Sequence, residues 1–241
     1  MKLHSLIAAA LLAVAGTSTS HAALIHQFNL NGSLKDSITN TSLAGLGGKL
    51  AGNQYVFGLN QGLKLDTALG GEYTIDMSFQ FDDFNRYGRI IEFGNLGREN
   101  GLYAEYNKFR LYGYSDAAAG ALVKDVNSRV SITRDAAKMF RVYQDGVLVL
   151  SVLDSNGIAD FGSNPAHFFK DNTSGSYTNE ANTGAVDYIR VFDKALTRTE
   201  LLALPTPPSE ADVVEPASLS LMGAGLALLG WTRRRRQRSL A

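Results

Sequence analysis

The chain contains no cysteine in its 241 residues, so it has neither a disulfide framework nor a structural zinc site built on thiolates. Histidine is almost as scarce, because only His26 and His167 lie beyond residue 22. Serine-hydrolase chemistry needs a histidine base, and transition-metal centres commonly use several imidazoles. The sequence therefore disfavours both kinds of site, and stability has to come from a hydrophobic core.

An excess of positive charge is also absent. The formal net charge is zero, but six of the 23 basic residues lie in the two terminal segments, whereas all 23 acidic residues lie between residues 36 and 215. The intervening part thus carries 17 basic and 23 acidic groups, a formal charge of −6. Nucleic-acid binding needs a basic face, so we expect no nucleic-acid partner.

Proline is rare, and four of the five prolines lie between residues 205 and 216. A proline-rich stretch is extended and semi-rigid. We therefore expect residues 205–212 to link a folded domain, residues 23–204, to a separate C-terminal segment. A domain of about 180 residues is long enough to bury one core.

Long apolar runs are missing as well. At the N-terminus, Lys2 and His4 precede ten residues of apolar character, Leu6–Ala15, and Ser20-His21-Ala22 follows. A membrane span needs roughly 20 residues, so this run favours a secretory signal peptide over an anchor. The small residues at positions 20 and 22 predict cleavage after Ala22, and we expect residues 1–22 to be removed on export.

The C-terminal residues 213–241 have three parts. These are the short signature Val214-Glu215-Pro216, the uncharged stretch Ala217–Trp231, and the four arginines Arg233, Arg234, Arg235 and Arg236. Arginines beside an apolar segment stay on the cytoplasmic side, which leaves the rest of the chain outside. The tail resembles the PEP-CTERM sorting signal, which exosortases recognise in Gram-negative bacteria that secrete exopolysaccharide, although valine replaces its first proline. The resemblance implies an exosortase-type protease as a partner.

The apolar stretch at the C-terminus is short for a membrane span. Its 15 residues would form a helix of about 22 Å, against a hydrocarbon core of roughly 30 Å. This length suits a tail that is held briefly in the inner membrane and then cut, after which the protein reaches the cell envelope, the surface or the medium. A stable short anchor is the alternative.

Between the terminal segments the hydrophobic pattern repeats every two residues. In Tyr73–Phe81 (YTIDMSFQF) apolar and polar side chains alternate, which is typical of a half-buried antiparallel strand. Asp145-Gly146 predicts a type I′ hairpin turn, which needs positive φ at both central positions. Thr197 and Glu200 form a capping box that predicts a helix over Arg198–Leu204. Further strands are predicted at Leu24–Leu30, Gln54–Phe57, Gly62–Leu65, Arg89–Phe93, Gly101–Tyr106, Lys108–Tyr114, Asp125–Thr133, Met139–Gln144, Val147–Leu153, Ala166–Phe169 and Val186–Phe192.

Many short antiparallel strands separated by glycine-rich turns predict an all-β fold, a two-sheet sandwich with one short C-terminal helix. Three segments resemble laminin-G-like domains, which have the concanavalin-A-like jelly-roll fold. These are Phe28–Ser37 (FNLNGSLKDS), Ile132–Gly146 (ITRDAAKMFRVYQDG) and Gly184–Leu201 (GAVDYIRVFDKALTRTEL). The resemblance implies an antiparallel jelly-roll sandwich over residues 23–204, but one fold hosts many activities.

A catalytic carboxylate motif is absent. Some glucanases of this fold carry Glu-x-Asp-x-Glu on one strand, and a retaining pair lies about 5–5.5 Å apart. The chain has no such triplet, and Glu92 and Glu105, on separate predicted strands, fit solvated surface carboxylates better. The sequence therefore predicts that the protein is not an enzyme, with an unrecognised glycan-active site as the remaining alternative.

Oxygen-rich loops offer a candidate calcium site. Calcium takes six to eight oxygen ligands, and laminin-G-like domains sometimes hold it at the sandwich rim. Asp36, Asp171, Asn172 and Glu180 offer such oxygens near the matching segments. The alternative is ordinary turn chemistry, in which Asp and Asn bond to nearby backbone. No other cofactor is expected.

Four tyrosines form a candidate ligand-binding surface. Tyr103, Tyr106, Tyr112 and Tyr114 lie on two adjacent predicted strands. Aromatic faces exposed in a groove suit sugar binding, whereas cross-strand core packing is the alternative. We expect an exported envelope or extracellular-matrix protein whose domain binds polysaccharide or another matrix component. The alternative is a structural or adhesive matrix protein without a specific glycan ligand.

Overall fold

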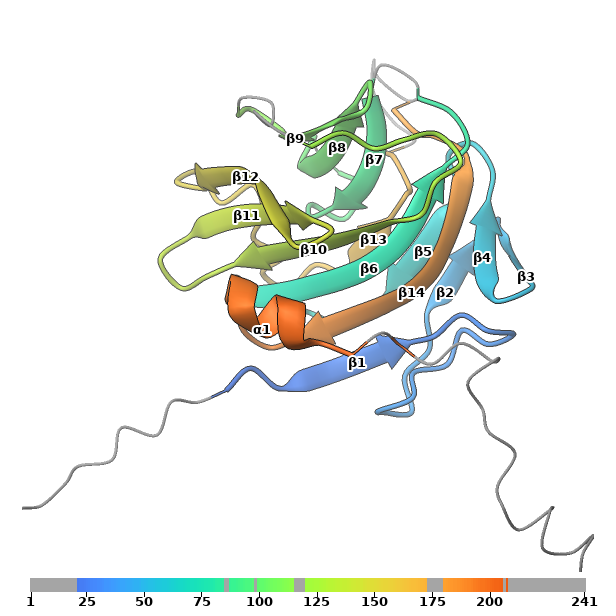
Figure 1. Ribbon diagram of the computed structural model, residues 1–241, viewed down its shortest axis with the longest axis horizontal. Coiled ribbons are helices and arrows are strands. Elements are labelled where there is room, and N and C mark those ends of the chain that lie inside the picture. The colour runs from blue at the N-terminus through green and yellow to red at the C-terminus, as the bar shows by residue number, and fades with distance from the viewer. Residues whose placement is uncertain are drawn as a thin grey trace, which may run out of the picture.

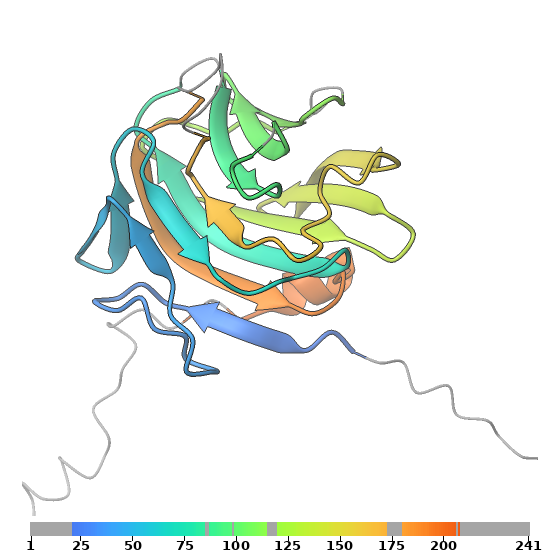
Figure 2. The ribbon, with the colours of Figure 1, turned by 180° about the vertical axis from the view of Figure 1, so that it is seen from behind.

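The protein folds into two antiparallel β-sheets that pack face to face (Figures 1 and 2). The computed structural model describes residues 21–84, 87–97, 99–114, 120–172, 180–205 and 207. The strands and helix in these residues are β1 Leu24–Phe28, β2 Ala44–Leu46, β3 Lys49–Ala51, β4 Gln54–Phe57, β5 Gly62–Leu65, β6 Tyr73–Phe81, β7 Tyr87–Glu92, β8 Gly101–Glu105, β9 Lys108–Leu111, β10 Ser128–Arg134, β11 Met139–Gln144, β12 Val147–Leu153, β13 Ala166–Phe168, β14 Gly184–Phe192 and α1 Arg198–Ala203.

The two sheets differ in size. The larger sheet has the strand order β12-β11-β10-β6-β14-β4-β3, with β1 also paired to β14, and the smaller sheet has the order β2-β5-β13-β7-β8-β9. All these strand pairings are antiparallel. The predicted all-β, two-sheet sandwich with one short C-terminal helix is confirmed.

The core lies between the sheets. On β6 the apolar side chains of the alternating pattern point inward, and none of them is more than 1% exposed. Aromatic rings join the two sheets: Phe57 of β4 stacks on Phe169, which follows β13, with ring centroids 4.4 Å apart. Because each fully buried phenylalanine contributes roughly 1.5–3 kcal/mol, this aromatic layer is a main source of stability in a chain without disulfides.

The outer face of β6 is less exposed than its sequence pattern predicts. Thr74 and Asp76 are both completely buried. The helix α1 and the segment before it cover this end of the larger sheet, as Figure 1 shows from the front and Figure 2 from behind. Thr74 Oγ1 donates to Lys194 O and accepts from Leu196 N, both at 2.7 Å, so the covering segment supplies the partners that water would otherwise provide.

Asp76 is the centre of a charged network on this outer face. Its Oδ1 accepts from Arg129 Nε at 2.8 Å, and its Oδ2 accepts from Arg190 Nη2 at 2.7 Å. The same arginines reach onward, since Arg129 Nη2 donates to Leu201 O at 2.8 Å and Arg190 Nη1 donates to Pro205 O at 2.6 Å. The buried carboxylate of Asp76 therefore holds β10 and β14, the strands that neighbour β6, and the helix α1 together.

Two local predictions are confirmed. Thr197 caps α1 and Glu200 closes the capping box, with Thr197 N donating to Glu200 Oε2 at 2.8 Å. The helix ends at Ala203, one residue earlier than expected. Asp145 and Gly146 have φ values of 50° and 79°, as a type I′ turn between β11 and β12 requires.

Several strand boundaries differ from the predicted ones because the backbone turns away from the extended region. Asp125 has φ 59°, and β10 begins only at Ser128. Gly113 has φ 75°, and β9 ends at Leu111. The strands β2 and β3 were not predicted, since three residues each carry too little alternation to be recognised.

The predicted terminal segments lie almost entirely outside the described residues. Of the predicted signal peptide only residues 21 and 22 are described, and the predicted sorting tail is not described at all. Within the described part of the chain, no helix has the length and apolar character needed to cross a membrane.

We predict that Gly184→Ala strongly destabilises the domain. A Cβ at this position would lie 2.1 Å from Gln80 O on β6 and 3.0 Å from Phe57 Cζ. The carbonyl cannot move away without breaking the pairing of β6 with β14, so we expect a loss of about 2–3 kcal/mol in the free energy of unfolding, measured by urea denaturation.

Gly97→Ala is the matched control, because the nearest atom to its new Cβ would be Gly94 O at 3.6 Å. This variant should be as stable as the wild type within about 0.5 kcal/mol. Equal stability of the two variants would contradict the close approach of β6 to β14.

Candidate functional site

Arg89 on β7 is a completely buried cation. Its Nη1 donates to Glu92 Oε2, and its Nη2 donates to Asp171 Oδ1 at 2.5 Å and to Glu99 Oε2 at 3.1 Å. Its Cζ lies 4.3 Å from the ring centroid of Tyr103. A buried charge is stable only when it is paired and hydrogen-bonded, and these acidic side chains supply the pairing.

The acidic residues around Arg89 come from separate parts of the chain. Glu92 ends β7, Glu99 lies between β7 and β8, and Asp171 and Glu180 follow β13. Glu180 Oε2 is 3.9 Å from Arg89 Nη2. We call these five residues the Arg89 cluster. Four carboxyl groups face one guanidinium, so the cluster is short of positive charge.

Burial raises the pKa of two of these carboxyl groups. Burial raises the pKa of Glu92 to about 7, although the neighbouring charge of Arg89 opposes the shift. Burial and then the charge of Glu99 raise the pKa of Glu180 to about 7. Burial also raises the pKa of Tyr103, whose hydroxyl donates to Glu99 Oε2 at 2.8 Å. Near neutral pH Glu92 and Glu180 are therefore partly protonated.

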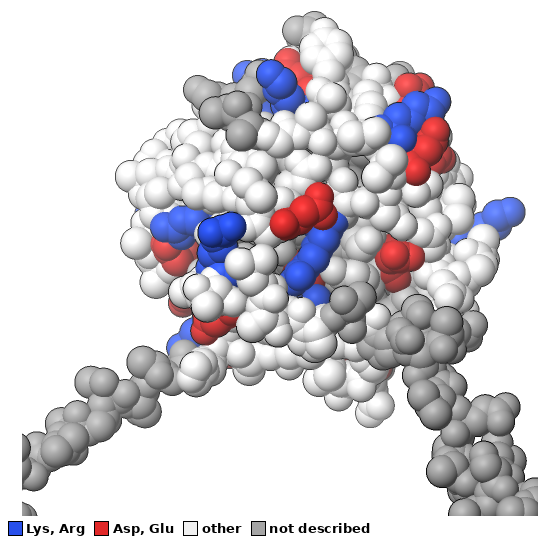
Figure 3. All heavy atoms as spheres, viewed as in Figure 1, with Lys and Arg blue, Asp and Glu red and all other residues white. Residues whose placement is uncertain are grey.

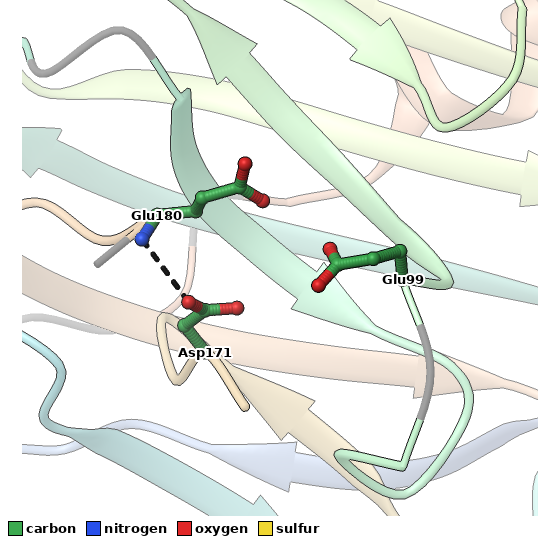
Figure 4. Close-up of side chains that lie close together, drawn as sticks. All are labelled: Glu99, Asp171 and Glu180. Atoms are coloured by element: carbon green, nitrogen blue, oxygen red, sulfur yellow. Dashed lines mark hydrogen bonds between the residues drawn. The ribbon is translucent and has the colours of Figure 1, made fainter. Parts of the chain in front are cut away.

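Three of the carboxylates are close enough to share one metal ion. Oxygens of Glu99, Asp171 and Glu180 all lie within 4.8 Å of one another, and Figure 4 shows Glu99 pointing toward the other two. Two oxygens bound to calcium at roughly 2.4 Å can be no more than roughly 4.8 Å apart. The all-oxygen donor set suits calcium, but Arg89 already donates to two of the three carboxylates.

The structure brings three of the four predicted calcium ligands together. Glu180 N donates to Asp171 Oδ2 at 3.0 Å, and Asn172 Nδ2 donates to Glu99 Oε1 at 3.0 Å. Asp36 does not join them. Its Oδ1 accepts from Gln27 N at 2.8 Å, and its Oδ2 contacts His26 Nδ1 at 2.7 Å, so it closes the turn after β1.

The sequence analysis missed Arg89 and Glu99, and its assignment of Glu92 to the solvated surface was wrong, since Glu92 is 0% exposed. The two charges in the otherwise apolar run Arg89–Phe93 (RIIEF) were the available signal of a buried pair. Period two places residues three apart on opposite faces, but a register shift between Arg89 and Ile91 lets Arg89 and Glu92 meet. Glu99 lies in a loop and carried no such signal.

The four predicted ligand-binding tyrosines do not share one environment. Tyr103 is 3% exposed and lies against Arg89. Tyr114 is half-buried, and its hydroxyl donates to Asp154 Oδ1 at 3.3 Å. Tyr106 and Tyr112 are 60% and 44% exposed and lie beyond opposite ends of β9. Sugar binding by these two exposed rings stays a prediction.

The sequence matches no known protein-family profile, and no curated protein matches it significantly. Several solved structures are similar. Domain 4 of AbnA, a GH43 extracellular arabinanase from Geobacillus stearothermophilus solved with arabinotriose, has a TM-score of 0.58 and 14% identity, over 77% of this chain and 99% of that one. A Trypanosoma rangeli sialidase mutant with trans-sialidase activity has a TM-score of 0.58 and 17% identity, over 74% of this chain and 32% of that one. The receptor-binding domain of botulinum neurotoxin type G has a TM-score of 0.52 and 16% identity, over 74% of this chain and 49% of that one.

At these identities the likeness shows the fold alone. This chain spans about a third of the length of the sialidase that it matches. The prediction that the protein is not an enzyme has to be corrected, because similar sandwiches occur in a sialidase and in an arabinanase. The missing Glu-x-Asp-x-Glu triplet therefore does not separate this chain from proteins that act on glycans.

We predict that the Arg89 cluster makes stability fall as pH rises from about 5 to about 8. The raised pKa of Glu180, about 7, means that the folded state holds this proton more tightly than the unfolded state does. The stabilisation is complete below the unfolded pKa, roughly 4.3, and is lost as pH rises through the folded pKa. Glu180→Gln should reduce the fall by about 1 kcal/mol, after allowance for solvent screening.

Urea unfolding at pH 5, 6, 7 and 8 measures this effect, with Asp66→Asn as the control because the Asp66 side chain is 74% exposed and lies outside the cluster. Calcium added at pH 8 should restore part of the lost stability in the wild type and less in Glu180→Gln. Identical pH profiles for the wild type and Glu180→Gln would contradict the assignment.

Proposed function

We propose that this chain is an exported bacterial envelope protein whose β-sandwich binds a polysaccharide or another glycan of the extracellular matrix. The observation that carries this proposal is the correspondence with the arabinanase domain solved with arabinotriose, which extends over 99% of that domain. In the sialidase, by contrast, the match covers 32% of the chain. Similarity to one entire domain supports a unit that binds glycan by itself.

Export is the second part of the proposal, and it rests on the terminal segments. The predicted signal peptide, residues 1–22, would be removed, and the tail at residues 213–241 would be sorted by an exosortase-type protease at the inner membrane. Ala23 N donates to Asp193 Oδ1 at 2.7 Å. Cleavage after Ala22 would turn this nitrogen into an ammonium group, and a charge-assisted hydrogen bond to Asp193 is stronger than a neutral one.

A glycan array probed with the purified full chain tests the binding function. We expect saturable binding to at least one polysaccharide. The same array in calcium and in a chelator shows whether the Arg89 cluster contributes through a bound ion. If the protein binds no glycan on the array although circular dichroism shows that it is folded, the result would instead favour a structural or adhesive matrix protein without a specific glycan ligand.

We predict that replacing the four arginines Arg233–Arg236 with glutamine impairs membrane retention and processing of the tail. The reason is that the basic residues orient the apolar segment with its C-terminal end in the cytoplasm. Fractionation and mass spectrometry of the protein in an exosortase-containing host measure both effects. Arg238→Gln alone is the control and should behave as the wild type, whereas normal processing of the fourfold variant would count against the sorting proposal.

A further inference from the structure

A polar pocket of about 410 Å³ opens on the outer face of the larger sheet, away from the Arg89 cluster of the smaller sheet. This volume lies within the range of small-molecule sites, roughly 300–1,000 Å³. The residues around it come from seven separate stretches of the chain: Asn29, Asn31, Asn53, Ser78, Asn127, Arg129, Asp145, Asp187, Tyr188 and Pro207.

The floor of the pocket consists of three neighbouring strands. Ser78 of β6 pairs with Arg129 of β10 on one side and with Tyr188 of β14 on the other. Turns form the walls, because Asn53 lies in the turn between β3 and β4 and Asp145 lies in the turn between β11 and β12. A rigid sheet thus carries the site, and turns supply most of its polar groups.

We propose that this pocket is the saccharide-binding site of the domain and that its ligand is an uncharged, hydroxyl-rich sugar. This inference rests on the proposed function, glycan binding, and adds the location of the binding site and the class of its ligand.

The donors and acceptors of the pocket match sugar hydroxyl groups, which both donate and accept. Four asparagine amides offer both functions, and two aspartate carboxylates accept. Asn53 and Asn127 are exposed, and Asn29 and Asn31 are half-buried, so their amides can reach a ligand. Burial raises the pKa of Tyr188 to about 12, so its phenol stays neutral, and its hydroxyl is hydrogen-bonded to Asp76 within the floor of the pocket.

The polar groups of the floor are held in place before a ligand arrives. Arg129 is fixed by Asp76 and by Leu201 O, and its backbone N donates to Asp145 Oδ1 at 3.0 Å. The guanidinium of Arg190 lies 5.0 Å from the ring centroid of Tyr188. Groups that are already ordered lose little conformational entropy on binding, which favours recognition of a weakly bound sugar.

The charge of the pocket selects against polyanions. Asp76 is shared by Arg129 and Arg190, which leaves one excess positive charge. By contrast, Asp145 in a wall turn and Asp187 on β14 add two negative charges. On this face, seen in Figure 3, acidic and basic side chains are interspersed without a large basic area in view. A uronate-rich polysaccharide would meet repulsion from both aspartates, and a neutral sugar would not.

The experiment uses the full chain and measures dissociation constants by affinity electrophoresis. The neutral probes are dextran, galactomannan and linear arabinan, and the anionic probe is alginate. Asn53→Ala/Asn127→Ala should bind a neutral probe at least tenfold more weakly than the wild type, because each lost hydrogen bond costs roughly fivefold. Its melting temperature should be unchanged, since both side chains are exposed.

Asn40→Ala/Asn156→Ala is the matched control, because it removes two exposed asparagine side chains outside the pocket. Its affinity should change less than twofold. Asp187→Asn is a second pocket variant that keeps the size of the side chain, and it should weaken binding without any change in melting temperature.

Wild-type affinity in both pocket variants would overturn this site while leaving glycan binding intact. Preference of the wild type for alginate, or no binding to any neutral probe, would overturn the ligand class. The glycan array described above then decides separately whether glycan binding itself fails.

Discussion

The burial of one carboxylate, that of Asp76, constrains most of the outer face of the larger sheet. A buried charge that loses its partners costs about 3–5 kcal/mol, so the folded chain has to keep arginines from β10 and β14 in contact with it. Those arginines in turn hold carbonyl groups at the end of α1 and just beyond it. The helix, the start of the linker and the floor of the polar pocket are thereby positioned together.

The two charged networks of the sandwich have opposite imbalances of positive and negative groups. On the larger sheet one carboxylate faces two guanidinium groups, Arg129 and Arg190. On the smaller sheet one guanidinium, that of Arg89, faces four carboxyl groups. The first network fixes Arg129 in the floor of the polar pocket through Asp76 and Leu201 O. The second has an excess of carboxyl groups, and burial raises the pKa of two of them, Glu92 and Glu180, to about 7.

Local signals predicted the fold well. The alternation in Tyr73–Phe81, the Asp145-Gly146 turn and the Thr197–Glu200 capping box depend on short-range geometry, and the structure contains all three. The sites were much harder to predict. The meeting of Arg89 with Glu92 depends on a register shift in β7, which no residue pattern announces. The pocket combines residues between 29 and 207. These residues are close together because of the order of the strands in the sheet, which no local residue pattern predicts.

The central claim is that the outer face of the larger sheet receives a neutral sugar. A crystal structure of the full chain with a neutral oligosaccharide tests it most directly. We predict sugar hydroxyl groups within roughly 2.5–3.2 Å of the side chains of Asn127 and Asp187, with Arg129 still hydrogen-bonded to Asp76 and to Leu201 O. A sugar bound instead over Tyr106 or Tyr112, or at the Arg89 cluster, would contradict the account.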